Sequence, residues 1–86
     1  MKLDFYYLND CPYCVKVQSF ISSHNLESKI DYHEIEDDPE AHDRLKHMLG
    51  GEDQVPCLVI DGRPMLESED IIAWLKENLI QRKRVG

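Results

Sequence analysis

Short apolar runs separated by polar turns extend along the chain, and their spacing predicts alternating strands and helices. Residues 3–8 are rich in aromatic side chains and end at Asn9-Asp10, which is typical of a β-strand followed by a turn. Val17, Phe20 and Ile21 recur at the spacing of one helix face, so they predict a helix. The predicted elements are a strand at 3–8, a helix at 12–26, a strand at 29–36, a helix from Asp38-Pro39 to Gly50-Gly51, strands at 56–60 and 63–66, and a helix that Ser68 caps, with Ile71, Ile72, Leu75 and Leu79 on its apolar face.

Capping and turn residues support these boundaries. Asp38 and Pro39 suit the N-cap and the first position of the second long helix, and Ser68 suits the N-cap of the last one. Asp61-Gly62 between two strands is a hairpin signal. The order is therefore β-α-β-α-β-β-α, which predicts an α/β domain with a mixed four-stranded sheet and helices on both faces.

Length and charge narrow the possible functions. The 86 residues are enough for one domain, residues 1–86, of which 81–86 are expected to be a frayed basic tail. A net charge of −7 leaves no basic face for nucleic acid. No apolar run is long enough to span a membrane, and the first residues do not resemble a secretory signal, so the cytoplasm is the expected compartment. Nothing in the pattern indicates oligomerisation, and a monomer is expected.

A close pair of cysteines is the strongest chemical signal in the sequence. Cys11 and Cys14 lie at i and i+3, with Cys11 at the predicted N-cap of the first helix. Thiolate is the reactive form of cysteine, and the positive end of a helix dipole stabilises it. Cys14 lies one turn further into the helix, beneath the first sulfur. The pair therefore predicts an attacking thiol, Cys11, and a resolving thiol, Cys14, within disulfide range.

A structural metal site is the main alternative interpretation of the cysteine pair. Zinc usually takes two ligand pairs, and Cys57 with His42 or His47 matches no standard spacing, so we assign no metal site. Cys57 lies in an apolar strand and is predicted to be a small buried side chain. Val55-Pro56 opens that strand. If its peptide bond is cis, the backbone of Val55 could pair with an extended substrate, but the pattern permits either isomer.

Taken together, these motifs resemble those of the glutaredoxins over essentially the whole chain. The resemblance rests on Cys11-Pro12-Tyr13-Cys14 after the first strand, Val55-Pro56 before the third strand, and the Asp61-Gly62 hairpin. It implies a thioredoxin-like fold, a cis bond at Pro56, and glutathione bound across Tyr13, Val55 and the start of the last helix. It also implies that Pro12 favours redox chemistry over the iron–sulfur cluster role of some relatives.

Two segments depart from the common glutaredoxin pattern. Leu8 stands where many members have a lysine, and Leu66-Glu67-Ser68-Glu69 stands where many have Gly-Gly-x-Asp. Glu67-Ser68 is instead similar to the acid–serine pair with which glutathione transferases hold the γ-glutamyl end of glutathione. An ammonium can pair with Glu67, and a carboxylate can bind the Ser68 hydroxyl and the helix N-terminus. The alternative is that Ser68 is a plain N-cap.

Lys16 resembles the basic residue that is common two positions after the second cysteine in both families. It would steady the Cys11 thiolate or the glutathione, or would be a solvated lysine. The whole pattern predicts a glutathione-dependent thiol–disulfide oxidoreductase that reduces protein disulfides and protein–glutathione mixed disulfides. Its partners would be glutathione as co-substrate and disulfide-containing or glutathionylated proteins, with no tightly bound cofactor. The alternatives are a glutathione transferase-like enzyme, whose large helical domain 86 residues cannot contain, and a non-catalytic metal or iron–sulfur carrier.

Overall fold

Four short strands form one mixed sheet in the computed structural model, which describes residues 1–80. The strands are β1 (Leu3–Tyr7), β2 (Asp31–Glu34), β3 (Cys57–Ile60) and β4 (Arg63–Leu66), in the spatial order β2-β1-β3-β4. β1 pairs in parallel with β2 and antiparallel with β3, and β3 pairs antiparallel with β4. The mixed four-stranded sheet is therefore as predicted. The predicted basic tail at 81–86 lies outside the described residues.

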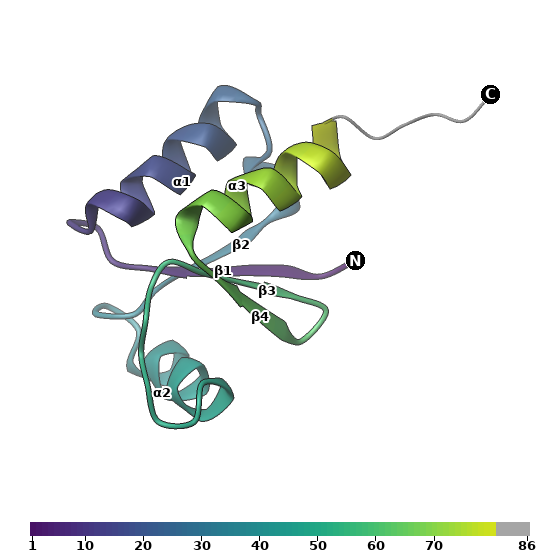
Figure 1. Cartoon of the computed structure of the whole chain (residues 1–86). Coiled ribbons are helices and arrows are strands. Elements are labelled where there is room, and N and C mark those ends of the chain that lie inside the picture. The colour runs from purple at the N-terminus through teal and green to yellow at the C-terminus, as the bar shows by residue number, and fades with distance from the viewer. Residues whose placement is uncertain (81–86) are drawn as a thin grey trace.

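Helices cover both faces of this sheet, as the element order predicts. α1 (Pro12–Ser23) and α3 (Ser68–Leu75) lie next to each other on one face, and α2 (Pro39–Met48) lies on the other (Figure 1). A single 3₁₀ turn, Glu27–Lys29, precedes β2, and a π-helical segment, Lys76–Ile80, continues α3. None of the described helices is long and apolar enough to cross a bilayer.

The alternation of side chains along β1 supplies an apolar layer on each face. Leu3 and Phe5 are buried on the face that α1 and α3 cover, and they pack in a cluster with Ile21. Tyr6 points to the opposite face and belongs to a second buried cluster that includes Leu45 of α2. Because both faces of β1 are covered, this strand forms the centre of the fold and fixes the position of the loop that follows it.

Several predicted elements are longer than the observed ones by one to three residues at an end, and two of these differences have a clear local cause. The first helix ends at Ser23 rather than at residue 26 because Asn25 adopts a left-handed conformation, with φ 54°. The second strand is limited to Asp31–Glu34 because the 3₁₀ turn occupies residues 27–29. The first strand ends at Tyr7 rather than at residue 8, and the third begins at Cys57 rather than at residue 56.

The capping and turn predictions for α2 and the hairpin are confirmed. The Asp38 side chain accepts a hydrogen bond from the backbone N–H of Ala41 at 3.2 Å, and Pro39 occupies the first helical position. Asp61 and Gly62 both have positive φ, at 48° and 88°. Two such residues form the tight turn that joins β3 to β4, because the backbone twist of this turn matches the right-handed twist of the two strands.

Candidate active site

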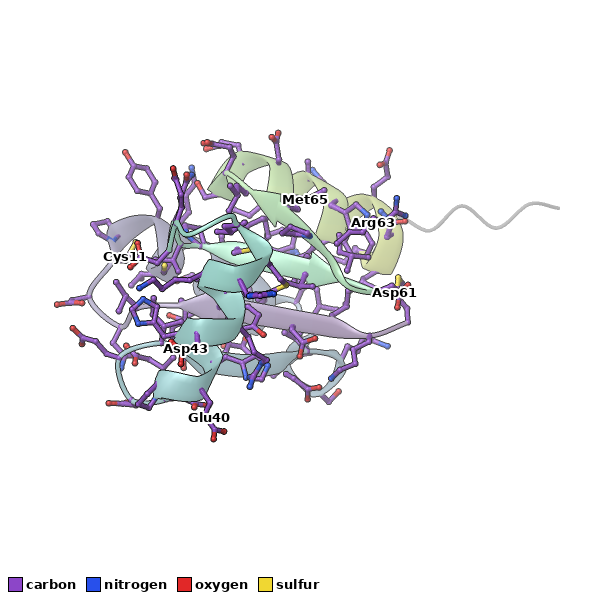
Figure 2. The ribbon with its side chains drawn as sticks, turned by 90° about the horizontal axis from the view of Figure 1, so that it is seen from below. Cys11, Glu40, Asp43, Asp61, Arg63 and Met65 are labelled. Atoms are coloured by element: carbon purple, nitrogen blue, oxygen red, sulfur yellow. The ribbon has the colours of Figure 1, made fainter. Side chains whose placement is uncertain are left out.

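Cys11 occupies the N-cap of α1, at the end of the loop that follows the central strand β1. Its backbone is extended, with φ −91° and ψ 118°, and its carbonyl accepts from the N–H of Val15 at 2.9 Å. Its Sγ accepts a hydrogen bond from the backbone N–H of Cys14 at 3.4 Å. The sulfur therefore takes the role of a capping oxygen, and a negative charge on it would face the positive end of α1. Figure 2 shows Cys11 at one end of the sheet and Asp61 at the other.

Cys14 differs from Cys11 in its surroundings, although only one helical turn separates them. Cys11 is partly exposed, whereas Cys14 is fully buried. Burial, helped by the hydrogen bond and charge of Cys11, raises the pKa of the Cys14 thiol to about 12, while a backbone hydrogen bond at Leu8 acts in the opposite direction. Cys14 therefore keeps its proton near neutral pH. An accessible sulfur at a helix N-terminus beside a buried protonated thiol is the arrangement that stepwise thiol–disulfide exchange uses.

The loop that leads to Cys11 is fastened by the side chain of Glu34, the last residue of β2. The Glu34 Oε2 accepts from the backbone N–H of Asn9 at 3.1 Å. Its Oε1 accepts from the N–H groups of Glu36 and Asp37, each at 2.8 Å. Desolvation opposes ionisation of this carboxyl group, but the three backbone donors lower the pKa of Glu34 overall. One carboxylate thus ties the β1–α1 loop to the β2–α2 turn.

A groove of about 380 Å³ lies beside the first turn of α1 and brings together five of the predicted glutathione-binding residues. These are Tyr13, Val55, Pro56, Glu67 and Ser68. Tyr13 is 64% exposed, so its ring is available to a ligand. The Val55–Pro56 peptide bond is cis, as the glutaredoxin resemblance implies. Gln54 and Glu69 also line the groove. Sequence reasoning missed both, although each is adjacent to a predicted site residue.

The start of α3 corrects one sequence prediction. Glu67, not Ser68, occupies the N-cap, with φ 76° and no capping hydrogen bond from its side chain. The strand β4 ends at Leu66, so a single residue must turn the chain into the helix, and the helix begins directly at Ser68. The Glu67 carbonyl accepts the N–H of Ile71 at 3.0 Å. Ser68 is 7% exposed at the first helical position, where its own N–H is one of the unpaired helix donors.

Lys16 lies outside the groove that the other predicted binding residues line. Its ammonium forms an ion pair with the carboxylate of Glu69, which joins α1 to the first turn of α3. Because Glu69 does line the groove, this ion pair offsets one negative charge at its wall. Both side chains are at least half exposed, so the pair contributes little to stability.

Cys57 is a buried side chain, as predicted, and takes no part in the thiol pair. It begins β3 and is fully enclosed between the sheet and α2. Burial raises the pKa of its thiol to about 11, against a smaller lowering by a backbone hydrogen bond at Met65. Among residues 1–80, no cluster of three His, Cys, Asp or Glu side chains is placed to hold a metal ion.

Comparisons with known proteins show the family and the fold of the chain. A family model described as glutaredoxin matches residues 1–65, and the chain belongs to the glutaredoxin family. The match ends just before Leu66-Glu67-Ser68-Glu69, the segment that departs from the common pattern. The family and the thioredoxin-like fold indicate a thiol–disulfide oxidoreductase kind of function. No match was found among curated proteins.

Solved structures with the same fold include a thioredoxin-like protein, a glutaredoxin and a glutathione S-transferase. The thioredoxin-like protein BC3987 is 27% identical, with a TM-score of 0.70 over 86% of this chain and 99% of that protein. Escherichia coli glutaredoxin is 24% identical, with a TM-score of 0.61 over 92% of this chain and 98% of its own. A diazinon-metabolizing glutathione S-transferase of the silkworm Bombyx mori is 18% identical, with a TM-score of 0.69, but only 39% of that chain is matched. At the last two identities the likeness concerns the fold alone.

Proposed function

We propose that the protein is a glutathione-dependent thiol–disulfide oxidoreductase that reduces protein disulfides and protein–glutathione mixed disulfides through Cys11 and Cys14. The observation that supports this most directly is the groove beside α1. It presents an exposed aromatic ring, Tyr13, the backbone of Val55 in the bend before β3, and an acid–serine pair at the N-terminus of α3. These groups suit the peptide backbone and the charged γ-glutamyl end of glutathione.

Each part of the groove corresponds to one part of the tripeptide. The Val55 backbone can pair with the extended cysteinyl segment in the manner of an added strand. The α-ammonium of the γ-glutamyl group carries a positive charge, which the Glu67 carboxylate complements. Its α-carboxylate can bind the Ser68 hydroxyl and the unpaired N–H groups at the start of α3. Tyr13 belongs to the same helical turn as Cys11, so the glutathione sulfur would lie next to the nucleophile.

The proposed reaction begins when the Cys11 thiolate attacks the glutathione sulfur of a glutathionylated protein. A Cys11–glutathione disulfide forms, the protein–glutathione bond breaks, and the protein leaves as a thiolate that takes up a proton. The thiolate of a second glutathione then attacks the glutathione sulfur on Cys11. Oxidised glutathione leaves, and the Cys11 thiolate is restored. The cycle consumes one reduced glutathione for each mixed disulfide, and the other half of the oxidised glutathione comes from the substrate.

With a protein disulfide as substrate, Cys14 supplies the second thiol. Cys11 attacks one sulfur and releases one protein thiolate, leaving a mixed disulfide between Cys11 and the protein. Forming that bond removes the thiolate charge of Cys11, one of the groups that raise the pKa of Cys14. Cys14 then loses its proton and attacks Cys11, which frees the second protein thiol and closes a Cys11–Cys14 disulfide. Two glutathione molecules reduce that disulfide and become oxidised glutathione.

The source of electrons tests the proposal. NADPH consumption would be followed with a glutathionylated protein as substrate, either with glutathione and glutathione reductase or with thioredoxin reductase alone. We expect turnover with the first system and at least a tenfold lower rate with the second. Equal or faster reduction by thioredoxin reductase would contradict the glutathione dependence while leaving the thiol chemistry of the family in place.

A further inference from the structure

A hollow lies between α2 and the sheet, and neither Cys11 nor Cys14 lines it. It has a volume of about 530 Å³, within the range of pockets that hold small molecules. Lys2 and Gly62 mark its outer end, and the backbone N–H of Lys2 donates to Asp61 at 2.8 Å. Figure 2 shows Asp61 at the end of the sheet opposite Cys11, with α2 crossing between them. Any ligand in this cavity would therefore be separate from the proposed glutathione groove.

The interior of the cavity is mainly apolar. Val59 and Met48 contribute aliphatic surface, from β3 and α2 respectively. The ring of Tyr6 is stacked on His33, with 4.8 Å between ring centroids. This lining favours a ligand with a hydrocarbon or aromatic body, because such a body gains free energy when it leaves water.

A hydrogen-bond donor at the cavity wall has no protein acceptor. Tyr6 is 4% exposed, and its hydroxyl oxygen accepts from the Nε–H of Arg44 at 3.3 Å. No described residue accepts the proton of this hydroxyl, so it can be donated to a ligand. Arg44 makes no ion pair within residues 1–80, and its terminal N–H groups are also available. A guanidinium and a hydroxyl that share one hydrogen bond can both donate to a single carboxylate.

The one carboxylate in the lining belongs to Asp4, which has two nitrogen partners among the described residues. Asp4 Oδ1 lies 2.9 Å from His33 Nε2 and 3.3 Å from Lys2 Nζ. Lys2 Nζ also pairs with Asp31 at 2.8 Å, so this ammonium is shared between two carboxylates.

No carboxylate within residues 1–80 lies in ion-pair distance of Arg44. The Tyr6 hydrogen bond, and after it the charges of Asp38 and Glu40, raise the pKa of its guanidinium. The chain as a whole has a charge of −7, so the Arg44 guanidinium is a local positive group at the wall of an apolar hollow on a protein that is negative overall.

From this arrangement we propose that the cavity binds a small organic carboxylate with an apolar body. Arg44 and the Tyr6 hydroxyl would hold the carboxylate, and Val59 and Met48 would contact the body. The proposal is independent of the glutathione function, because none of these residues lines the groove beside Cys11.

Titration of the full chain with hexanoate, followed by NMR, tests the site, with hexan-1-ol and hexylammonium as probes that have the same number of carbon atoms. We expect hexanoate to shift the resonances of Tyr6, Met48 and Val59 and to bind about tenfold more tightly than hexan-1-ol, the effect of one charge-assisted contact. Hexylammonium should bind more weakly than either. Hexanoate binding no tighter than that of hexan-1-ol would overturn the proposal, as would shifts centred on Tyr13 and Val55.

Three variants separate the carboxylate site from general charge and packing effects. Arg44→Gln should lower hexanoate affinity about tenfold, to that of hexan-1-ol, without changing the affinity for hexan-1-ol. Tyr6→Phe, which removes only the hydroxyl, should lower it about fivefold. Arg63→Gln is the matched control, because it removes the same charge from β4 outside the cavity. An equal loss in Arg63→Gln and Arg44→Gln would show long-range attraction only and would overturn the proposal.

Discussion

The backbone N–H of Cys14 donates a hydrogen bond to the sulfur of Cys11, 3.4 Å away. The residue proposed to resolve the mixed disulfide therefore also supports the nucleophile that forms it. The same residue has a buried side chain whose pKa is raised to about 12, chiefly by desolvation. Its backbone thus favours charge on Cys11 while its own thiol stays neutral. Because the two roles belong to different atoms, substitution of the side chain can separate them.

Cys11→Ser should abolish reduction of both substrate classes because it removes the nucleophile. Cys14→Ser should keep the removal of glutathione from modified proteins, since free glutathione can resolve that intermediate and the backbone N–H remains. It should lose most reduction of a protein disulfide. Initial rates on a glutathionylated protein and on insulin would be compared. Equal inactivity of both variants on the glutathionylated protein would contradict the assigned roles.

The three cysteines should differ widely in their rates of alkylation. With substoichiometric iodoacetamide at neutral pH, the first carboxamidomethyl group should appear on Cys11, the partly exposed sulfur at the helix N-terminus. Cys14 and Cys57 should react only after the fold is opened with denaturant, because burial raises their pKa values to about 12 and about 11. Mass mapping of tryptic peptides would locate the label. Early labelling of Cys57 in the native protein would contradict its enclosure.

Removing the charge of Glu67 should weaken glutathione recognition without affecting the nucleophile. Glu67→Gln should raise KM for a glutathionylated substrate by about tenfold to a hundredfold, the value of one charge-assisted contact. The alkylation rate of Cys11 should stay unchanged. Ser68→Ala should raise KM in the same direction. Since Glu67 rather than Ser68 is the N-cap, Ser68→Ala should not incur the loss of a capping hydrogen bond.

Asp70→Asn is the matched control for this test. Asp70 lies in the same first turn of α3 and carries the same charge, but it does not line the groove. Its KM should stay within about twofold of the wild-type value, a shift that corresponds to less than half a kcal/mol. If neither Glu67→Gln nor Ser68→Ala changes KM by threefold, the γ-glutamyl end binds elsewhere.

Cys57 should make the protein less stable in alkali. Its pKa is about 11 when folded, against 9.0 for an ordinary thiol, so only the unfolded chain loses this proton as pH rises above 9. The folded state then binds more protons, and the free energy of unfolding falls, by about 1.4 kcal/mol per pH unit at most. The stability that the buried neutral thiol contributes is complete below pH 9 and lost as pH approaches 11.

Comparison with Cys57→Ala isolates this effect from the tyrosines and lysines. The variant should be less stable than the wild type by about 1–2 kcal/mol at pH 8, because a small cavity replaces the sulfur. Because the variant lacks the ionisable group, the stability advantage of the wild type should fall by about 2 kcal/mol at pH 10.5, so that it disappears or reverses. Urea unfolding of both proteins under reducing conditions measures it. A difference that stays constant with pH would contradict the folded pKa.

Much of the fold could be predicted because short local motifs determine where its helices begin and where its chain turns. Asp38 caps α2 with its own side chain, and Pro39 fixes the φ angle of the first helical residue. Asp61 and Gly62 tolerate the positive φ angles of the hairpin turn. These conformations depend little on the rest of the fold. Cys11 was placed correctly at the N-cap for the same reason. The departure at α3 is different. Ser68 is a better capping residue than Glu67, but the end of β4 at Leu66 leaves only one residue for the turn. The first residue of α3 is therefore determined by where β4 ends, and not by the capping preference of Ser68.

The binding residues could be predicted only in part, because the groove combines segments that are distant in sequence. The cysteine motif and the acid–serine pair are visible as short patterns. The role of Lys16 depends on Glu69, 53 positions later, and no local pattern predicts their ion pair. The cavity under α2 was missed entirely, since Tyr6 and Arg44 look like an ordinary strand residue and an ordinary helix residue until tertiary packing joins them.

The carboxylate of Glu34 holds its neighbours by their backbone N–H groups, not by their side chains. The shape of the loop before Cys11 is therefore encoded by one acid on a strand, and the side chains of Asn9, Glu36 and Asp37 are not needed to maintain it. All three side chains are exposed, on the two segments that the Glu34 carboxylate joins, and Asn9 is two residues from Cys11. These side chains can be substituted while the backbone keeps its shape. Preference among protein substrates could therefore be altered there without a change in the loop.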